Sequence, residues 1–357
     1  MTQTETAAPP EPVDWALAER VARRFAGREP IAASYLGGSL PLDFSAVTSE
    51  AEQLVGDFSG LRAPGTAVAR VLDRPQWVQA NVASMRRLLQ PLTERVGERM
   101  ARSPIAPIGR RVAGTEMGML LGFMAQRVLG QYDLLVPEDP TAPDASDAVY
   151  YVGPNILALE KRYAFRPRDF RLWIAIHEVT HRAQFTAVPW MKRYFLSLID
   201  EALAIVDPDP GRLVQAMIRA ADELRKGHNP LDDGGLVALL ASPEQRGVLA
   251  KVQALMSLLE GHGNMVMNEL GRLHVAGQER MARVLQARRR NRGVTGILYK
   301  LLGFESKLRQ YEVGEEFVTA VGREGGPRAI DAAWRSPESL PTLEELTRPS
   351  EWLRRVA

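Results

Sequence analysis

The sequence predicts a mainly α-helical fold of the α+β type, in which a helical N-terminal region precedes further helices that lie beside a small β-sheet. Two observations lead to this prediction. Apolar residues recur at helical spacing through most of the 357 residues. Strand-like runs are confined to one stretch, AVYYV followed by ILALEKRY, between positions 148 and 163.

The N-terminal region is expected to begin with a disordered tail over residues 1–12, which are polar, small and rich in proline. Residues 13–135 read as helical throughout, with no competing strand signal. Within them Gly114, Gly118 and Gly122 recur every four residues. A phosphate-binding loop would need a preceding strand and a following Lys-Ser or Lys-Thr. The stripe is therefore expected to let another helix approach closely.

A proline-rich acidic stretch at 136–147 predicts a loop or hinge. Residues 148–357 would then form the second region. AVYYV and ILALEKRY are expected to be two strands joined by a turn at Gly153-Pro154-Asn155. Tyr150 to Val152 is a candidate edge strand that could pair with an extended substrate backbone. A purely structural hairpin is an equal alternative.

The stretch HEVTH, residues 177–181, is the clearest chemical pattern in the chain. Asp169 is expected to be the N-cap of a helix, and Pro167 should stop any helix from the preceding segment. Trp173, Ile174 and Ile176 would bury the helix. Histidines four residues apart lie on one face of a helix, where both imidazoles can reach one zinc ion. Glu178 points off that axis and can act as a base toward water.

A third ligand is expected on a downstream helix from about Pro243 to Leu270. Ser242, Pro243 and Gln245 supply its start signals. Glu260 and His262 lie on this helix, about 200 degrees apart around its axis, so both cannot face one metal. Helical geometry does not choose between them. His228 and His274 are more remote. Helices are also expected over 189–205 and 211–226.

Four segments together carry a resemblance: GPNILALE, RLWIAIHEVTHRAQF, LLEGHGN and KLRQYEVGEEFV. The chain resembles the zincin-like metallopeptidase family, first catalogued as a domain of unknown function, which includes a subgroup associated with deazaflavin coenzyme biosynthesis. The resemblance covers most of the chain after Val13. It implies a zincin-like fold, with His177, His181 and Glu260 as Zn²⁺ ligands and Glu178 as the general base. His262 stays the alternative ligand.

The same resemblance implies a role for Asn264, one turn beyond Glu260. Several zincins place there an aspartate that accepts a hydrogen bond from a ligand histidine. An amide oxygen can accept this bond without a negative charge, and would raise the basicity of the ligand less. The donor that stabilises an oxyanion stays unassigned among His228, His262, His274 and Tyr311.

The sequence thus predicts a zinc-dependent hydrolase, a metallopeptidase acting on a peptide or protein. The alternative is a zincin-like scaffold that binds metal or a protein partner without efficient catalysis. The chain has no cysteine, so thiolate ligands and a cysteine nucleophile are excluded. With no export leader at Met1, a cytoplasmic location is expected.

No membrane partner is expected, since Glu116, Gln126 and Arg127 interrupt the apolar run from Val112 to Leu129. No nucleic-acid partner is expected either. The net charge is only +2, and the arginine-rich stretch from Arg280 to Arg292 carries no aromatic residue for base stacking. It is expected to be a solvated or salt-bridged helix face.

Overall fold

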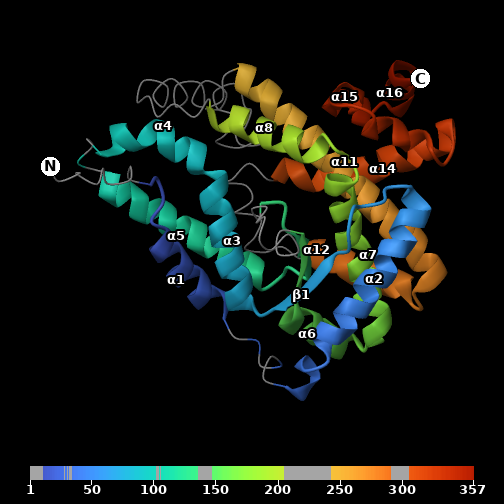
Figure 1. Ribbon diagram of the computed structural model, residues 1–357, viewed down its shortest axis with the longest axis horizontal. Coiled ribbons are helices and arrows are strands. Elements are labelled where there is room, and N and C mark those ends of the chain that lie inside the picture. Colours follow the sequence, from blue (N-terminus) through green and yellow to red (C-terminus); the bar gives the residue numbers. More distant parts are fainter. Residues whose placement is uncertain are drawn as a thin grey trace. The chain divides into compact units, whose positions relative to one another are not determined.

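Figure 1 shows the computed structural model of the protein, which describes residues 11–27, 29, 31, 34–101, 104, 106–135, 147–204, 243–290 and 305–357. The chain divides into two compact units. The first comprises Met1–Ala51 and Gly65–Val179, and the second comprises Glu52–Pro64 and Thr180–Ala357. The predicted hinge at 136–147 falls within the sequence range of the first unit, and 136–146 lie outside the described residues, as does most of the predicted tail.

In its described residues the first unit consists of helices and three short strands. The fold is mainly α with a small sheet, as predicted. Its elements are α1 (Trp15–Ala26), η2 (Tyr35–Gly37), α2 (Leu40–Ser59), β1 (Val68–Leu72), α3 (Arg74–Leu88), α4 (Gln90–Ala101), α5 (Ala106–Ala125), β2 (Gly130–Tyr132), β3 (Ala148–Val152), α6 (Gly153–Tyr163) and α7 (Pro167–Thr186). The last residues of α2 and α7 belong to the second unit.

Helix α1 packs along α5 (Figure 1), and the glycine stripe of α5 lies against α1. A β-carbon built on Gly118 would lie 2.6 Å from the carbonyl oxygen of Ala18, and one on Gly122 would lie 2.6 Å from the carbonyl oxygen of Ala22. Real β-carbons do not approach backbone atoms so closely, and only glycine fits at these positions. The predicted role of the stripe in helix packing is confirmed.

The sheet has the strand order β1-β3-β2. β1 runs parallel to β3, with Val68 opposite Ala148, and β2 runs antiparallel to β3, with Gly130 opposite Tyr151. The prediction that residues 13–135 contain no strand is therefore wrong. β1 and β2 are too short to show a clear alternation in the sequence, and pairing with the buried strand β3 defines them.

Tyr150 to Val152 belong to β3, which is the central strand of the described sheet and not an edge. Backbone pairing on both sides leaves β3 no free edge for a substrate. The prediction of an edge at these residues is wrong, and β1 and β2 form the edges of the sheet in the described part of the chain.

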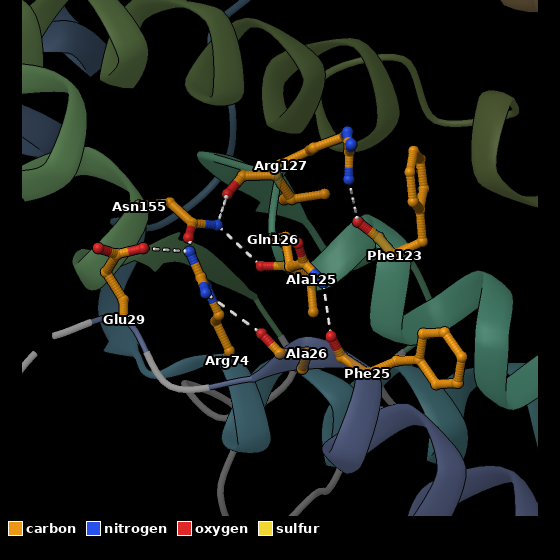
Figure 2. Close-up of polar contacts among 10 residues, drawn as sticks. Phe25, Ala26, Glu29, Arg74, Phe123, Ala125, Gln126, Arg127 and Asn155 are labelled. Carbon is orange, nitrogen blue, oxygen red and sulfur yellow. Dashed lines mark hydrogen bonds and ion pairs between the residues drawn. The ribbon is translucent and has the colours of Figure 1, made fainter. Parts of the chain in front are cut away.

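The segment ILALEKRY is helical, within α6, and is not the predicted second strand. Pro154 lies in the first turn of α6, where a missing N–H costs nothing. Asn155 does not form a hairpin turn but is buried. Its Oδ1 accepts from Nε of Arg74 at 2.8 Å, and its Nδ2 donates to the carbonyl oxygens of Ala125 and Val128 (Figure 2). Tertiary hydrogen bonds thus decide the conformation of a short apolar run that periodicity leaves ambiguous.

Trp173, Ile174 and Ile176 of α7 are buried, as predicted. The helix already begins at Pro167, and Asp169 lies in its first turn, so the prediction that Asp169 is the N-cap is wrong. The buried Arg171 donates from Nε and Nη2 to the two carboxylate oxygens of Glu160 on α6, at 2.8 and 2.9 Å. This two-point ion pair fixes the first half of α7 against α6.

The second unit is helical in its described residues. Its elements are α8 (Met191–Ala204), α11 (Pro243–His274), α12 (Gln278–Arg290), α14 (Glu305–Gly325), η4 (Ala329–Trp334), η5 (Pro337–Ser339), α15 (Leu343–Leu346) and α16 (Pro349–Val356). The predicted helix from Pro243 is confirmed. Ser242 and the helix predicted over 211–226 lie outside the described residues.

The core of this unit joins α11 to the C-terminal helices. Leu258 and Leu259 of α11 pack in one buried cluster with Phe317 of α14 and Trp352 of α16. The rings of Phe317 and Trp352 meet edge to face, with centroids 5.3 Å apart. The arginine-rich stretch lies mainly on α12, where Arg280 and Arg283 are exposed. No helix in the described ranges combines the length and apolar character that a membrane span requires.

Arg182, in the last part of α7, has no exposed surface. It donates to Oε1 of Glu52 at 2.7 Å and to the carbonyl oxygen of Pro64 at 2.8 Å. Both partners lie in the short segment Glu52–Pro64 that belongs to the second unit. A buried guanidinium requires such partners, because an unpaired charge in the interior is strongly unfavourable.

Candidate metal centre

His177 and His181 lie one turn apart on the same face of α7, and Glu260 lies on α11. One ligand atom from each of the three side chains lies within 4.8 Å of the others. Nε2 of His181 is 3.8 Å from Oε2 of Glu260. Among the described residues, these side chains form a group able to hold a metal ion.

The donor set fits a zinc ion. Two imidazole nitrogens and one carboxylate oxygen are ligands that zinc takes in catalytic sites, which keep a further position open for water. The side chains of His181 and Glu260 are 15% and 20% exposed, so the group is sheltered and still reached by solvent. The arrangement can therefore hold zinc and admit a water molecule.

Gln184 is a close neighbour of His181 that the sequence did not reveal. Its Oε1 lies 2.9 Å from Nδ1 of His181. Its Nε2 donates to the carbonyl oxygen of Leu259 at 2.9 Å and lies 3.0 Å from Nδ1 of His262. Gln184 follows His181 by three residues on α7, and this spacing was the available signal.

His262, the alternative ligand, is not part of the metal group in the described structure. It is buried, and its ring meets Trp334 edge to face at 5.1 Å between centroids. Burial, with a smaller contribution from His181, lowers the pKa of His262 to about 3. A neutral imidazole held by Gln184 is the resulting state. The geometry therefore favours Glu260 over His262 as the third ligand.

Asn264 is buried on α11, and its Oδ1 has no hydrogen-bond partner among the described residues. The hydrogen bond predicted from a ligand histidine to this oxygen is not present. Instead, the side-chain oxygen of Gln184, on α7, lies 2.9 Å from Nδ1 of His181.

Glu178 is buried and faces the edge strand β2. A β-carbon built on Gly130 would lie 2.6 Å from Cγ of Glu178 and 2.7 Å from its Oε1. Gly130 thus provides the space that the Glu178 side chain occupies. This neighbour was also missed, because residues 128–132 gave no strand signal in the sequence.

The residues considered as oxyanion donors are dispersed. His262 is buried behind Gln184, and His274 is exposed at the end of α11. His228 and the side chain of Tyr311 lie outside the described residues. The described structure brings none of them into the metal group.

A crystal structure from Chloroflexus aurantiacus, described provisionally as that of a hydrolase with a novel fold, is similar to this chain. The two share 30% sequence identity and a TM-score of 0.70, over 96% of this chain and 98% of the other. The search of curated proteins gave no match. The family model described as zincin-like metallopeptidase matches residues 13–353, and the chain therefore belongs to that family.

Proposed function

We propose that the protein is a zinc-dependent hydrolase, a metallopeptidase in which His177, His181 and Glu260 hold the metal and Glu178 is the general base. One observation carries the proposal. The ligand atoms of the three side chains converge within 4.8 Å, and Glu178 directly follows the first of them on the same helix. Family membership supports the same assignment.

Each residue of the chain has a separate task in this proposal. When bound, zinc supplies a Lewis acid and makes water a stronger acid near neutral pH. Glu178 takes a proton from the attacking water and later donates it to the leaving amine. Its buried position beside Gly130 holds the carboxylate in one place. Gln184 contacts Nδ1 of His181, and Nε2 of the same ring lies near Glu260.

A peptide or protein substrate is the second part of the proposal. β2 is an edge strand of the described sheet, and it contains Gly130, the residue against which Glu178 lies. An extended peptide can add to such an edge through main-chain hydrogen bonds. The peptide backbone would then run past the base. Gly130–Tyr132 would then pair with the substrate backbone, in place of Tyr150 to Val152.

A second candidate function is a scaffold that binds metal or a protein partner without efficient catalysis. Asn264 favours it, because this residue stands where several zincins have an orienting carboxylate and its Oδ1 has no partner in the described part of the chain. An amide at this position raises the basicity of a ligand histidine less than a carboxylate does.

Replacing Glu178 by Gln tests the proposal. The wild-type protein should carry about one zinc per chain by elemental analysis and should cleave members of a mixed peptide library. Glu178→Gln should keep the zinc and lose cleavage by a factor of about 10²–10⁴. Glu279→Gln, in the first turn of α12, is the matched control and should retain both.

The outcomes separate the two candidates. Zinc-loaded wild-type protein that cleaves no peptide would leave the scaffold as the function. Protein that binds no zinc would contradict the hydrolase and the metal-binding form of the scaffold. Cleavage by Glu178→Gln at the wild-type rate would remove Glu178 as the base.

A further inference from the structure

Gln184 sits in a fixed orientation at the centre of a buried hydrogen-bond chain. Its side chain is fully buried, and Nε2 lies 2.9 Å from the carbonyl oxygen of Leu259. A carbonyl oxygen can only accept a hydrogen bond, so the atom facing Leu259 must be the amide nitrogen. The amide oxygen must then face His181. The backbone of α11 thus decides which way the amide of Gln184 points.

The orientation of Gln184 in turn determines the tautomer of His181. Oε1 of Gln184 can only accept, so Nδ1 of His181 at 2.9 Å must carry the proton. In the neutral ring Nε2 is then the nitrogen without a proton, and Nε2 lies 3.8 Å from Oε2 of Glu260. A neutral His181 in this tautomer turns the lone pair needed for a metal bond toward Glu260.

His262 completes the chain. The amide nitrogen of Gln184 has two protons, and one goes to Leu259. The other points to Nδ1 of His262 at 3.0 Å, which must accept it. The His262 ring packs edge-on against Trp334, which fixes its position. All polar atoms of the Gln184 amide are therefore used, and the amide has no alternative orientation of equal energy.

We propose that Gln184 is a positioning residue that sets the tautomer and ring orientation of His181, and that His262 acts behind it as the acceptor that holds the Gln184 amide in place. This proposal rests on the metal site proposed above. It gives His262 a role other than metal ligation. In this protein the neutral side chain of Gln184 accepts the hydrogen bond from the ligand histidine that a carboxylate accepts in other metal sites.

The tautomers can be measured without metal or substrate. In neutral free histidine the proton resides mainly on Nε2, so a proton on Nδ1 reports an imposed environment. Long-range ¹H–¹⁵N correlation spectra of the metal-free full chain should show His181 with its proton on Nδ1 and His262 with its proton on Nε2. Single histidine substitutions assign the signals. A His181 ring protonated on Nε2 in the wild-type protein would overturn the proposal.

Gln184→Met removes the amide and keeps the length of the side chain. It should shift His181 toward the Nε2-protonated form and weaken zinc binding by about 10- to 100-fold, with one site per chain retained. The matched control is Gln278→Met. Gln278 is also buried and donates to Asn268, and its replacement should change neither the His181 tautomer nor zinc affinity.

His262→Phe keeps an aromatic ring against Trp334 and removes the acceptor. It should weaken zinc binding in the same direction as Gln184→Met, again without loss of the site. Complete loss of the zinc site in His262→Phe, with Gln184→Met unchanged, would show a ligand role for His262 and overturn the proposal. An unchanged affinity and tautomer in Gln184→Met would also overturn it.

The two proposals fail in different ways. Should the wild-type protein bind no zinc, the metal site fails while the tautomer measurement still decides the role of Gln184. Should Gln184→Met not fold, the wild-type spectrum alone decides it.

Discussion

Gly261 on α11 and Gly314 on α14 meet backbone to backbone. A β-carbon built on Gly261 would overlap the carbonyl group of Gly314, and one built on Gly314 would overlap the carbonyl oxygen of Ser257. No side chain separates the two helices at this crossing. Gly261 follows Glu260 directly, so the close approach also determines where α11 presents its carboxylate.

Gly261→Ala should lower the free energy of unfolding by about 1–3 kcal/mol, toward the upper end, because the obstructing atoms are backbone and cannot rotate away. Zinc affinity should fall with it, since α11 must shift. Urea denaturation and zinc competition measure the two effects. Gly247→Ala is the control: Gly247 is exposed on the same helix with open space around it, so this change should stabilise by about 0.5–1 kcal/mol. Equal effects of the two substitutions would contradict the packing argument.

Gly130→Ala should slow hydrolysis while leaving zinc bound. The added methyl group would lie within 2.8 Å of Cγ, Oε1 and Cδ of Glu178, so the carboxylate must move. A base displaced from its working position loses much of its contribution, which is about 10²–10⁴-fold for proton transfer. Peptide cleavage rates and zinc content test this. Gly109→Ala, at an exposed position with no neighbour within 4 Å, should leave both unchanged. A Gly130→Ala protein of wild-type activity would disprove the steric role.

Glu260→Ala should abolish tight zinc binding, because two imidazoles alone leave the metal short of a ligand. Glu269→Ala on the same helix should keep it, since Glu269 pairs with Arg272 away from the metal group. In the wild-type protein, zinc at 100 times its dissociation constant should raise the free energy of unfolding by about 2.7 kcal/mol, and a chelator should remove this increment. Thermal unfolding with and without chelator measures it. A chelator effect that persists in Glu260→Ala would count against Glu260 as a ligand.

Asp133 should make the protein less stable as the pH rises. Burial raises the pKa of its carboxyl above the ordinary value, although Leu135 N–H and the Ser84 hydroxyl partly offset this effect. A raised folded-state pKa means that the folded protein holds the proton more tightly. The stability that this tighter proton binding contributes is therefore fully present below the pKa of the carboxyl in the unfolded chain. It is lost as the pH rises through the pKa in the folded protein.

Asp133→Asn retains an acceptor and removes the charge. The variant should be more stable than the wild type at pH 7, and the difference in free energy of unfolding should shrink toward pH 4. Denaturation curves across this range test the prediction, and Asp57→Asn, on an exposed carboxylate, serves as the control. A stability difference that grows on acidification would contradict a raised pKa for Asp133.

The sequence predicted well the features that depend on local pattern. HEVTH on a buried helix, the long helix from Pro243 and the glycine stripe on α5 all follow from residue spacing along one element. β1, β2 and α6 were missed because their conformation depends on partners distant in sequence: β3 for the two strands, and the Asn155 hydrogen bonds for the helix.

The same distinction holds for the metal centre. His177 and His181 are linked by one helix turn, so the sequence pairs them. Choosing Glu260 over His262 requires the rotation of α11 relative to α7, which no local pattern encodes. Gln184 could be noticed from its spacing to His181, but its partners, Leu259 and His262, lie on another helix. The tertiary structure is needed to show that its amide is fixed.

The ion pair of Arg182 has a consequence for biosynthesis. Its partners, Glu52 and Pro64, leave the ribosome more than a hundred residues before Arg182 does. Closing so long a loop carries an entropic penalty that slows folding. A fragment that starts after Pro64 would retain the guanidinium but lose both acceptors. Such a fragment is therefore expected not to reach its folded state, and its expression should yield insoluble product.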